Sequence, residues 1–189
     1  MCEMLENFGY EMQKKKLSNR IKVNILDYLK ILKNNFLKKE NFYYLFLILI
    51  IFFLDRYTKN NIIDKHLENQ IYINEYINFD LIWNTGVGFG LLSTETSLIY
   101  NLVTFLIGII ILGILFIFMT SDKQDKLIYC LITGGALGNF YDRLVFKAVP
   151  DFIDLHYNSF HWFTFNVADI FITIGIILYV MLEIRKNKV

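Results

Sequence analysis

The chain has little cysteine, histidine or proline: its 189 residues include two cysteines, three histidines and one proline. Cys2 and Cys130 lie far apart, and no cluster of cysteine and histidine has the spacing of a zinc site. The sequence therefore predicts no metal, and we expect no cofactor. Cys2 has no apolar segment before it, unlike a lipid-attachment site, and we expect no cleavable signal peptide ahead of the first apolar stretch.

Apolar residues, by contrast, are abundant. They make up 55% of the chain and the mean hydropathy is +0.40, which is too apolar for an ordinary soluble domain. Four apolar stretches stand out, at residues 42–54, 98–119, 127–141 and 165–184. The first is short for a membrane span and must continue through residues 55–59 to cross the bilayer. The sequence therefore predicts an all-α polytopic membrane protein with four transmembrane helices.

Basic residues are distributed unevenly between the segments that join these stretches. Four spans place residues 1–41, 120–126 and 185–189 on one side of the membrane, and the loops near 60–97 and 144–165 on the other. Of the 19 lysines and arginines, those outside the first set are Arg56, Lys59, Lys65, Arg143 and Lys147. The positive-inside rule therefore predicts that both termini are cytoplasmic.

This topology divides the chain into three parts. Residues 1–41 form a basic cytoplasmic extension, which is compatible either with an interfacial amphipathic helix or with a poorly ordered tail. Residues 42–184 form the membrane domain, and residues 185–189 form a short cytoplasmic tail.

The ionisable side chains within the predicted spans all lie near the outer membrane surface. The first span runs outward and ends in Asp55 and Lys59, and the third runs outward and ends in Asp142 and Arg143. The fourth runs inward and begins near Asp169. Because charged groups within a membrane are costly and usually functional, this one-sided arrangement indicates a single polar site at the outer boundary.

Helical spacing brings several of these side chains onto common faces. Asn139 and Asp142 are three residues apart, and so are Asn166 and Asp169. Small residues at 134–138, which include a Gly-x-x-x-Gly pattern, predict that another helix approaches the third span closely just before its polar end.

The two outer loops have the composition of strands. Residues 70–77 alternate in part and are followed by the apolar residues 79–83 and a glycine-rich segment at 84–90, which is typical of a small antiparallel sheet. The second loop, residues 151–165, has aromatic and β-branched runs on either side of Asn158 and Ser159, compatible with another hairpin. We therefore expect a small extracytoplasmic β-sheet element over the polar site.

Asp151 and Asp169 are the candidate catalytic pair. Two carboxylates at close range do not both ionise readily, so one keeps its proton. The ionised member can take a proton from water while the protonated one polarises a carbonyl, which is a route to amide hydrolysis. Glycoside hydrolysis also uses two carboxylates and stays open at this point. Nucleophilic schemes are disfavoured because no serine or cysteine has an evident base partner.

Four blocks of residues, in this order, resemble the lipoprotein signal peptidase family (signal peptidase II). The blocks are Asp55-Arg56-Tyr57-Thr58-Lys59, Asn84-Thr85-Gly86-Val87-Gly88-Phe89-Gly90, Gly134-Gly135-Ala136-Leu137-Gly138-Asn139-Phe140-Tyr141-Asp142-Arg143, and Val149-Pro150-Asp151-Phe152 with Phe165-Asn166-Val167-Ala168-Asp169. The likeness covers residues 42–184, and the combination is far more specific than any one block. The N-terminal extension is longer than the family requires.

The resemblance implies an aspartic endopeptidase of the bacterial cytoplasmic membrane, which cuts diacylglyceryl-modified prolipoproteins before the lipidated cysteine at the outer face. Its catalytic dyad falls on Asp151 and Asp169. Its substrate-binding or site-shaping positions fall on Asn84, Asn139, Asp142, Arg143, Asn166, Asp55 and Lys59. The implied partners are prolipoprotein substrates and membrane lipid, and we expect no nucleic-acid partner and a monomer. Pro150 departs from the more usual aliphatic residue and favours extended backbone at Val149.

Two other classes of function are compatible with the apolar helices. A small proton- or ion-coupled transporter would also carry intramembrane Asp and Lys, although the inner halves of the predicted spans lack ionisable residues to continue a path. A non-catalytic assembly factor would tolerate loss of both aspartates. Asp154, close to Asp151, is expected to be structural or solvated rather than catalytic.

Overall fold

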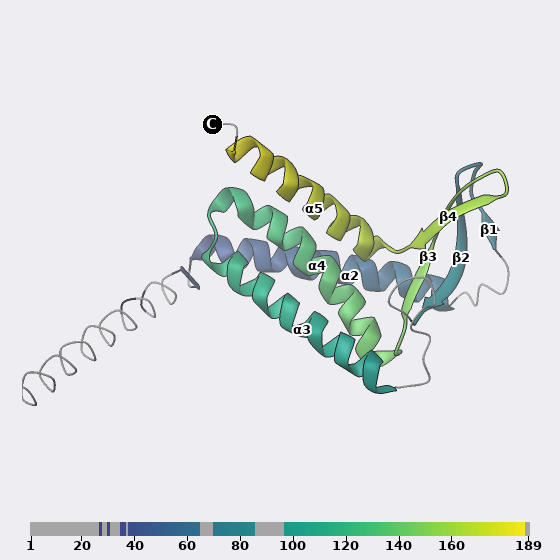
Figure 1. Ribbon diagram of the computed structural model, residues 1–189, viewed down its shortest axis with the longest axis horizontal. Helices are drawn as coiled ribbons and strands as arrows, with labels where there is room; N and C mark the ends of the chain where they lie inside the picture. Colours follow the sequence, from purple (N-terminus) through teal and green to yellow (C-terminus); the bar gives the residue numbers. More distant parts are fainter. Residues whose placement is uncertain are drawn as a thin grey trace, which may run out of the picture. The chain divides into compact units, whose positions relative to one another are not determined.

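The computed structural model describes residues 38–64, 70–85 and 97–187, together with residues 27, 30, 35 and 36. Four helices and four strands occur in this part of the chain: α2 (Lys39–Asp64), α3 (Ser97–Thr120), α4 (Lys123–Val145), α5 (Val167–Lys186), β1 (Ile71–Tyr72), β2 (Ile77–Asn84), β3 (Val149–Tyr157) and β4 (Phe160–Phe165). The helices extend alongside one another, and the strands gather at one end of them (Figure 1). The predicted N-terminal extension lies almost entirely outside the described residues and stays a prediction.

Three of the helices, α2, α3 and α5, are long and apolar enough to cross a membrane. Large apolar side chains remain exposed along them, including Phe53 on α2, Phe105 on α3 and Val180 on α5, an arrangement that suits lipid rather than water. The first span continues beyond Leu54, as predicted, because α2 runs to Asp64. α4 is less apolar than the other three helices, since it carries charged residues at both ends and glycines between them.

Glycines of α4 allow two other helices to approach it closely. A Cβ atom on Gly134 would lie 2.8 Å from the side chain of Ile51 on α2, and one on Gly135 would collide with the backbone carbonyl of Ala168 on α5. α4 also packs against α3. The close approach predicted at residues 134–138 is therefore confirmed, and α4 is the helix that all the others contact.

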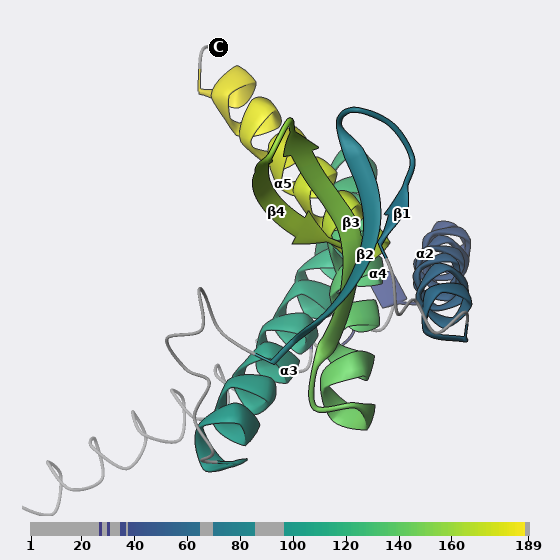
Figure 2. The same cartoon turned by 90° about the vertical axis from the view of Figure 1, so that its right-hand side faces the viewer.

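The strands form one antiparallel sheet in the order β1-β2-β3-β4 (Figure 2). The sequence predicted a sheet within residues 70–83 and a possible hairpin around Asn158, whose φ of 53° marks the turn between β3 and β4. The structure joins the two because β2 pairs with β3. β3 begins at Val149. Asp151 therefore lies on a central strand of the sheet, although its place in the sequence is the start of the second outer loop.

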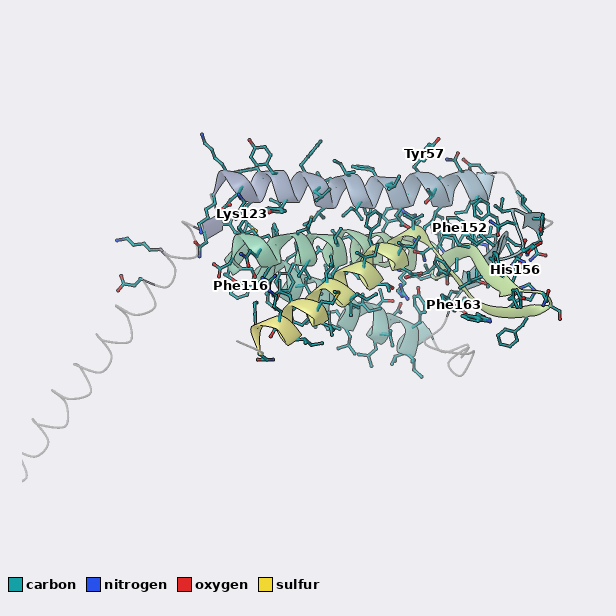
Figure 3. All side chains as sticks on the ribbon, turned by 90° about the horizontal axis from the view of Figure 1, so that it is seen from above. Tyr57, Phe116, Lys123, Phe152, His156 and Phe163 are labelled. Carbon is teal, nitrogen blue, oxygen red and sulfur yellow. The ribbon has the colours of Figure 1, made fainter. Side chains whose placement is uncertain are left out.

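The sheet lies at the end of the helical bundle where α2 and α4 finish and α5 begins. In Figure 3, Phe152, His156 and Phe163 lie at this end of the molecule, whereas Phe116 and Lys123 lie at the other. β3 follows α4 closely in sequence and packs against it, and β4 leads directly into α5. These two connections bring the start of β3 and the start of α5 to the same region.

Candidate active site

Asn166 connects Asp151 to Asp169. Its side-chain Nδ2 donates to Oδ1 of Asp151 at 2.6 Å, and its backbone N–H donates to Oδ2 of Asp169 at 3.1 Å. Its side-chain Oδ1 accepts from the backbone N–H of Asp169, also at 3.1 Å. Asn166 is the N-cap of α5, and its two reciprocal bonds with Asp169 form a capping box. The structure therefore brings both aspartates to one residue, although one lies on β3 and the other on α5.

Asp151 is buried, with 5% of its surface exposed. Its second oxygen, Oδ2, accepts a hydrogen bond from Nδ2 of Asn84 at the end of β2, at 2.9 Å. Burial raises the pKa of Asp151 above its ordinary value of 3.8, and the hydrogen bonds from Asn84 and Asn166 oppose this rise while the nearby Asp169 adds to it. The net direction is the one expected for an acid that retains a proton in the folded protein.

Asp169 accepts a further hydrogen bond from α4. Nδ2 of Asn139 donates to its Oδ1 at 2.7 Å, and Nζ of Lys59 donates to Oδ1 of Asn139 at 2.8 Å. Because Lys59 offers only donors, the amide oxygen of Asn139 faces Lys59 and the amide nitrogen faces Asp169. With Asn166 on its other oxygen, Asp169 accepts a hydrogen bond from an N–H donor on each carboxylate oxygen.

Two acids and two bases form a buried cluster behind Asn139. Asp55, Lys59 and Asp142 have 0% exposure and Arg56 has 7%. Nζ of Lys59 lies 2.9 Å from Oδ2 of Asp55 and 2.7 Å from Oδ2 of Asp142, and Nη1 of Arg56 lies 2.5 Å from Oδ1 of Asp142. The four charges balance, which lessens the cost of keeping them ionised where water is scarce.

Arg56 is the member of this cluster that is not among the predicted site residues. Its position in the sequence carries a signal, because it follows Asp55 directly and precedes Lys59 by about one helical turn, so all three lie near the same level of α2.

Arg143 and the glycine-rich segment differ from the other predicted site residues. Nη1 of Arg143 donates to the backbone carbonyl of Asn139, one turn earlier in α4, at 3.1 Å, and the backbone carbonyl of Arg143 accepts from the hydroxyl of Tyr100 on α3 at 3.3 Å. These contacts attach Arg143 to the helices rather than to either aspartate. Residues 86–90 lie outside the described residues.

Asp154 belongs to a separate polar group on the sheet. Its Oδ2 lies 2.7 Å from Nδ1 of His161 on β4 and accepts from Nε2 of Gln70 at 3.4 Å. The rings of His161 and His156 stack with their centroids 5.5 Å apart. Asp154 is 2% exposed and has partners of its own, which supports the prediction that it is structural.

The arrangement of the pair and its partners suits general acid–base chemistry. Burial favours the protonated form of Asp151, and both carboxyl groups accept hydrogen bonds from N–H donors of asparagine residues. Asn166 and Asn139 restrict the orientation of both side chains. A water molecule held between them could be deprotonated on one side while an amide carbonyl is polarised on the other.

Fold and site together define a multi-pass membrane protein with a pair of acids, one on β3 and one on α5, at one end of its helical bundle. The chain matches the family model of signal peptidase (SPase) II over residues 47–185, and it therefore belongs to that family. The class of protein indicated by the four sequence blocks is thus confirmed.

Individual relatives agree with this assignment. The lipoprotein signal peptidase of Pelagibacter ubique is 49% identical over 158 residues, which cover 82% of this chain and 95% of that protein. The lipoprotein signal peptidase of Aquifex aeolicus is 40% identical over 150 residues, covering 78% of this chain and 89% of that protein. A solved structure of a bacterial membrane enzyme superposes with a TM-score of 0.63 at 25% identity, covering 76% of this chain and 88% of that one.

Proposed function

We propose that this chain is a membrane aspartic endopeptidase that removes signal peptides from diacylglyceryl-modified prolipoproteins, with Asp151 and Asp169 as its catalytic pair. Membership of the signal peptidase II family supports the activity, with cleavage before the lipidated cysteine as the resemblance implies. The observation that supports the pair is the bridge through Asn166, which bonds to both carboxyl groups.

The two aspartates divide the work of amide hydrolysis. Asp169 takes a proton from a water molecule, and the resulting hydroxide attacks the scissile carbonyl carbon. Asp151 donates its proton to the carbonyl oxygen, so that a neutral tetrahedral intermediate forms. Asp169 then returns its proton to the amide nitrogen while Asp151 recovers its own, and the C–N bond breaks. The signal peptide leaves with a new carboxyl group, and the lipidated cysteine leaves with a free amine.

Neighbouring amides hold each aspartate in a fixed position. Asn84 and Asn166 hold the buried carboxyl of Asp151, and Asn139 and Asn166 hold that of Asp169. Fixed donors of this kind reduce the reorganisation needed when charge moves during the reaction.

The site lies on the outer side of the membrane in this proposal, and all four helices cross, including the less apolar α4. The excess of lysine and arginine in residues 1–41, 120–126 and 185–189 supports cytoplasmic termini. Exposed aromatic side chains on β4, including Phe160 and Trp162, suit the interface between headgroups and acyl chains. A lipidated substrate can then keep its acyl chains in the bilayer while its scissile amide reaches the ends of the helices.

The direct test is cleavage of a purified diacylglyceryl-modified prolipoprotein by the full chain in detergent. Wild-type protein should release the signal peptide, and Asp151→Asn and Asp169→Asn should each lose at least roughly a thousandfold in kcat. Asp154→Asn is the matched control on the same strand and should retain most of the activity. Near-normal turnover by Asp151→Asn, or loss of turnover by a folded Asp154→Asn, would show that the wrong acid has been assigned.

A further inference from the structure

Lys59 uses all of its hydrogen-bonding capacity inside the buried cluster. An ammonium group has three N–H donors. Nζ of Lys59 has three acceptors at 2.7–2.9 Å, namely Oδ2 of Asp55, Oδ2 of Asp142 and Oδ1 of Asn139. Any shift of Lys59 toward one acid therefore weakens its bond to Asn139, and Asn139 is the residue that donates to Asp169.

One lysine cannot neutralise two buried carboxylates. Asp55 and Asp142 both have 0% exposure, so little water reaches them to screen their charge. Arg56 supplies the second positive charge: Nη1 contacts Oδ1 of Asp142, the oxygen that Lys59 leaves unused, and Nη2 donates to Oδ2 of Asp55 at 3.3 Å. The guanidinium carbon also lies 5.0 Å from the ring centroid of Tyr141 on α4, a cation–π contact.

We propose that Arg56 is a positioning residue for the peptidase reaction, because it supplies the second positive charge that the Asp55–Asp142 pair needs and so lets Lys59 hold Asn139 against Asp169. This inference rests on the proposed catalytic role of Asp169. Arg56 touches neither aspartate of the catalytic pair in the contacts described, and it acts through Lys59 and Asn139.

Removal of the Arg56 charge leaves the cluster with an excess negative charge. The charged and titratable groups that face it are Asp55 and Lys59 on α2, Asp142 on α4 and, beyond Asn139, Asp169 on α5. Lys59 is then drawn toward the two carboxylates and away from Asn139. In Arg56→Gln we expect kcat to fall roughly tenfold to a hundredfold, as is usual when a catalytic group loses its orientation, with KM changed by no more than about twofold.

Removing one carboxylate should make Arg56 dispensable. In the double variant Arg56→Gln with Asp142→Asn, Lys59 faces a single carboxylate, and the new amide oxygen at position 142 can still accept from Lys59. Because Asp142 is itself a predicted site residue, the reference is Asp142→Asn alone, and we expect the double variant to match its kcat. Arg56→Lys, which keeps the charge but not the fork of two donors, should be intermediate. Arg185→Gln, at the exposed inner end of α5, is the control for loss of one arginine and should match wild type.

The experiment measures kcat and KM of these variants on a diacylglyceryl-modified prolipoprotein, using the full chain in detergent. A wild-type chain that fails to cleave overturns the proposed function. A wild-type chain that cleaves, with Arg56→Gln equal to Arg185→Gln, overturns only the role of Arg56. If Arg56→Gln does not fold, the comparison with Asp142→Asn decides: a double variant within about twofold of Asp142→Asn supports the inference, and one at least roughly tenfold slower overturns it.

Discussion

Oδ1 of Asp55 on α2 accepts a hydrogen bond from the backbone N–H of Ala168 on α5, at 2.9 Å. The first N–H groups of a helix have no partner within the helix, so α2 supplies one for the first turn of α5. Gly138 of α4 lies against the same carboxylate, and a Cβ atom there would collide with Oδ2 of Asp55. Three helices therefore meet next to Asp169, and the absence of a side chain at position 138 allows them to do so.

Gly138→Ala should disrupt this meeting point. An added methyl group must displace Asp55, at a cost of about 1–3 kcal/mol in the free energy of unfolding, and it should also lower kcat because Asp55 shares Lys59 with Asn139. Gly113→Ala is the matched control, since nothing lies within 4 Å of a Cβ at that position on α3. Thermal unfolding in detergent and cleavage rates test both variants. Equal behaviour of the two would contradict the close approach.

Substitutions of Asn166 should separate helix capping from catalysis. Asn166→Ser keeps a side-chain acceptor for the N–H of Asp169 but loses the amide donor that reaches Asp151, whereas Asn166→Ala loses both. We expect both variants to lose most of their activity. Only Asn166→Ala should also lose about 1 kcal/mol of stability, which is typical of removing an N-cap. Full activity in a stable Asn166→Ser would mean that the bond to Asp151 is dispensable.

Much of the helical part of the site could be predicted from the sequence, because helical periodicity and the direction of each span fix which side chains lie at the same level. Asp55, Lys59, Asn139 and Asp142 meet in the structure for this reason. Helical periodicity does not predict the conformation of a long side chain. Arg143 shares a face with Asn139, yet its guanidinium donates to its own helix.

The part of the site formed by the sheet could not be derived in the same way. Asn84 reaches Asp151 because β2 pairs with β3, with Ile82 opposite Asp151. That pairing joins segments far apart in the chain. The register also shifts between Phe79 and Ile82, so a strict alternation of side chains along β2 does not predict which residue lies opposite Asp151. Composition favours strands at both places, but it does not say which strands are neighbours.

The membrane orientation can be tested by labelling single cysteines in intact cells. In a background with Cys2→Ser and Cys130→Ser, Ser159→Cys in the turn between β3 and β4 should react with a membrane-impermeant maleimide. Ser121→Cys, in the connection between α3 and α4, should react only after the cells are permeabilised. The expected difference follows from cytoplasmic termini and an even number of crossings. Labelling of Ser121→Cys in intact cells would mean that the orientation is reversed.

Stability should depend on pH through Asp151. Because burial raises the pKa of Asp151 above 3.8, the folded protein holds a proton there over a range of pH in which the unfolded chain has released it. The free energy of unfolding therefore falls as pH rises through this range. Asp151→Asn cannot titrate, so its stability relative to wild type should improve as pH increases from about 4 toward neutrality. Thermal midpoints of both proteins across this range provide the measurement. Parallel stability curves for the two proteins would mean that Asp151 does not retain its proton on folding.

The activity of the wild type should depend on the same proton. The value of kcat/KM should decline on the basic side, since the catalytic pair then loses the proton that Asp151 donates to the substrate. Measurement of kcat/KM across the same range of pH tests this expectation.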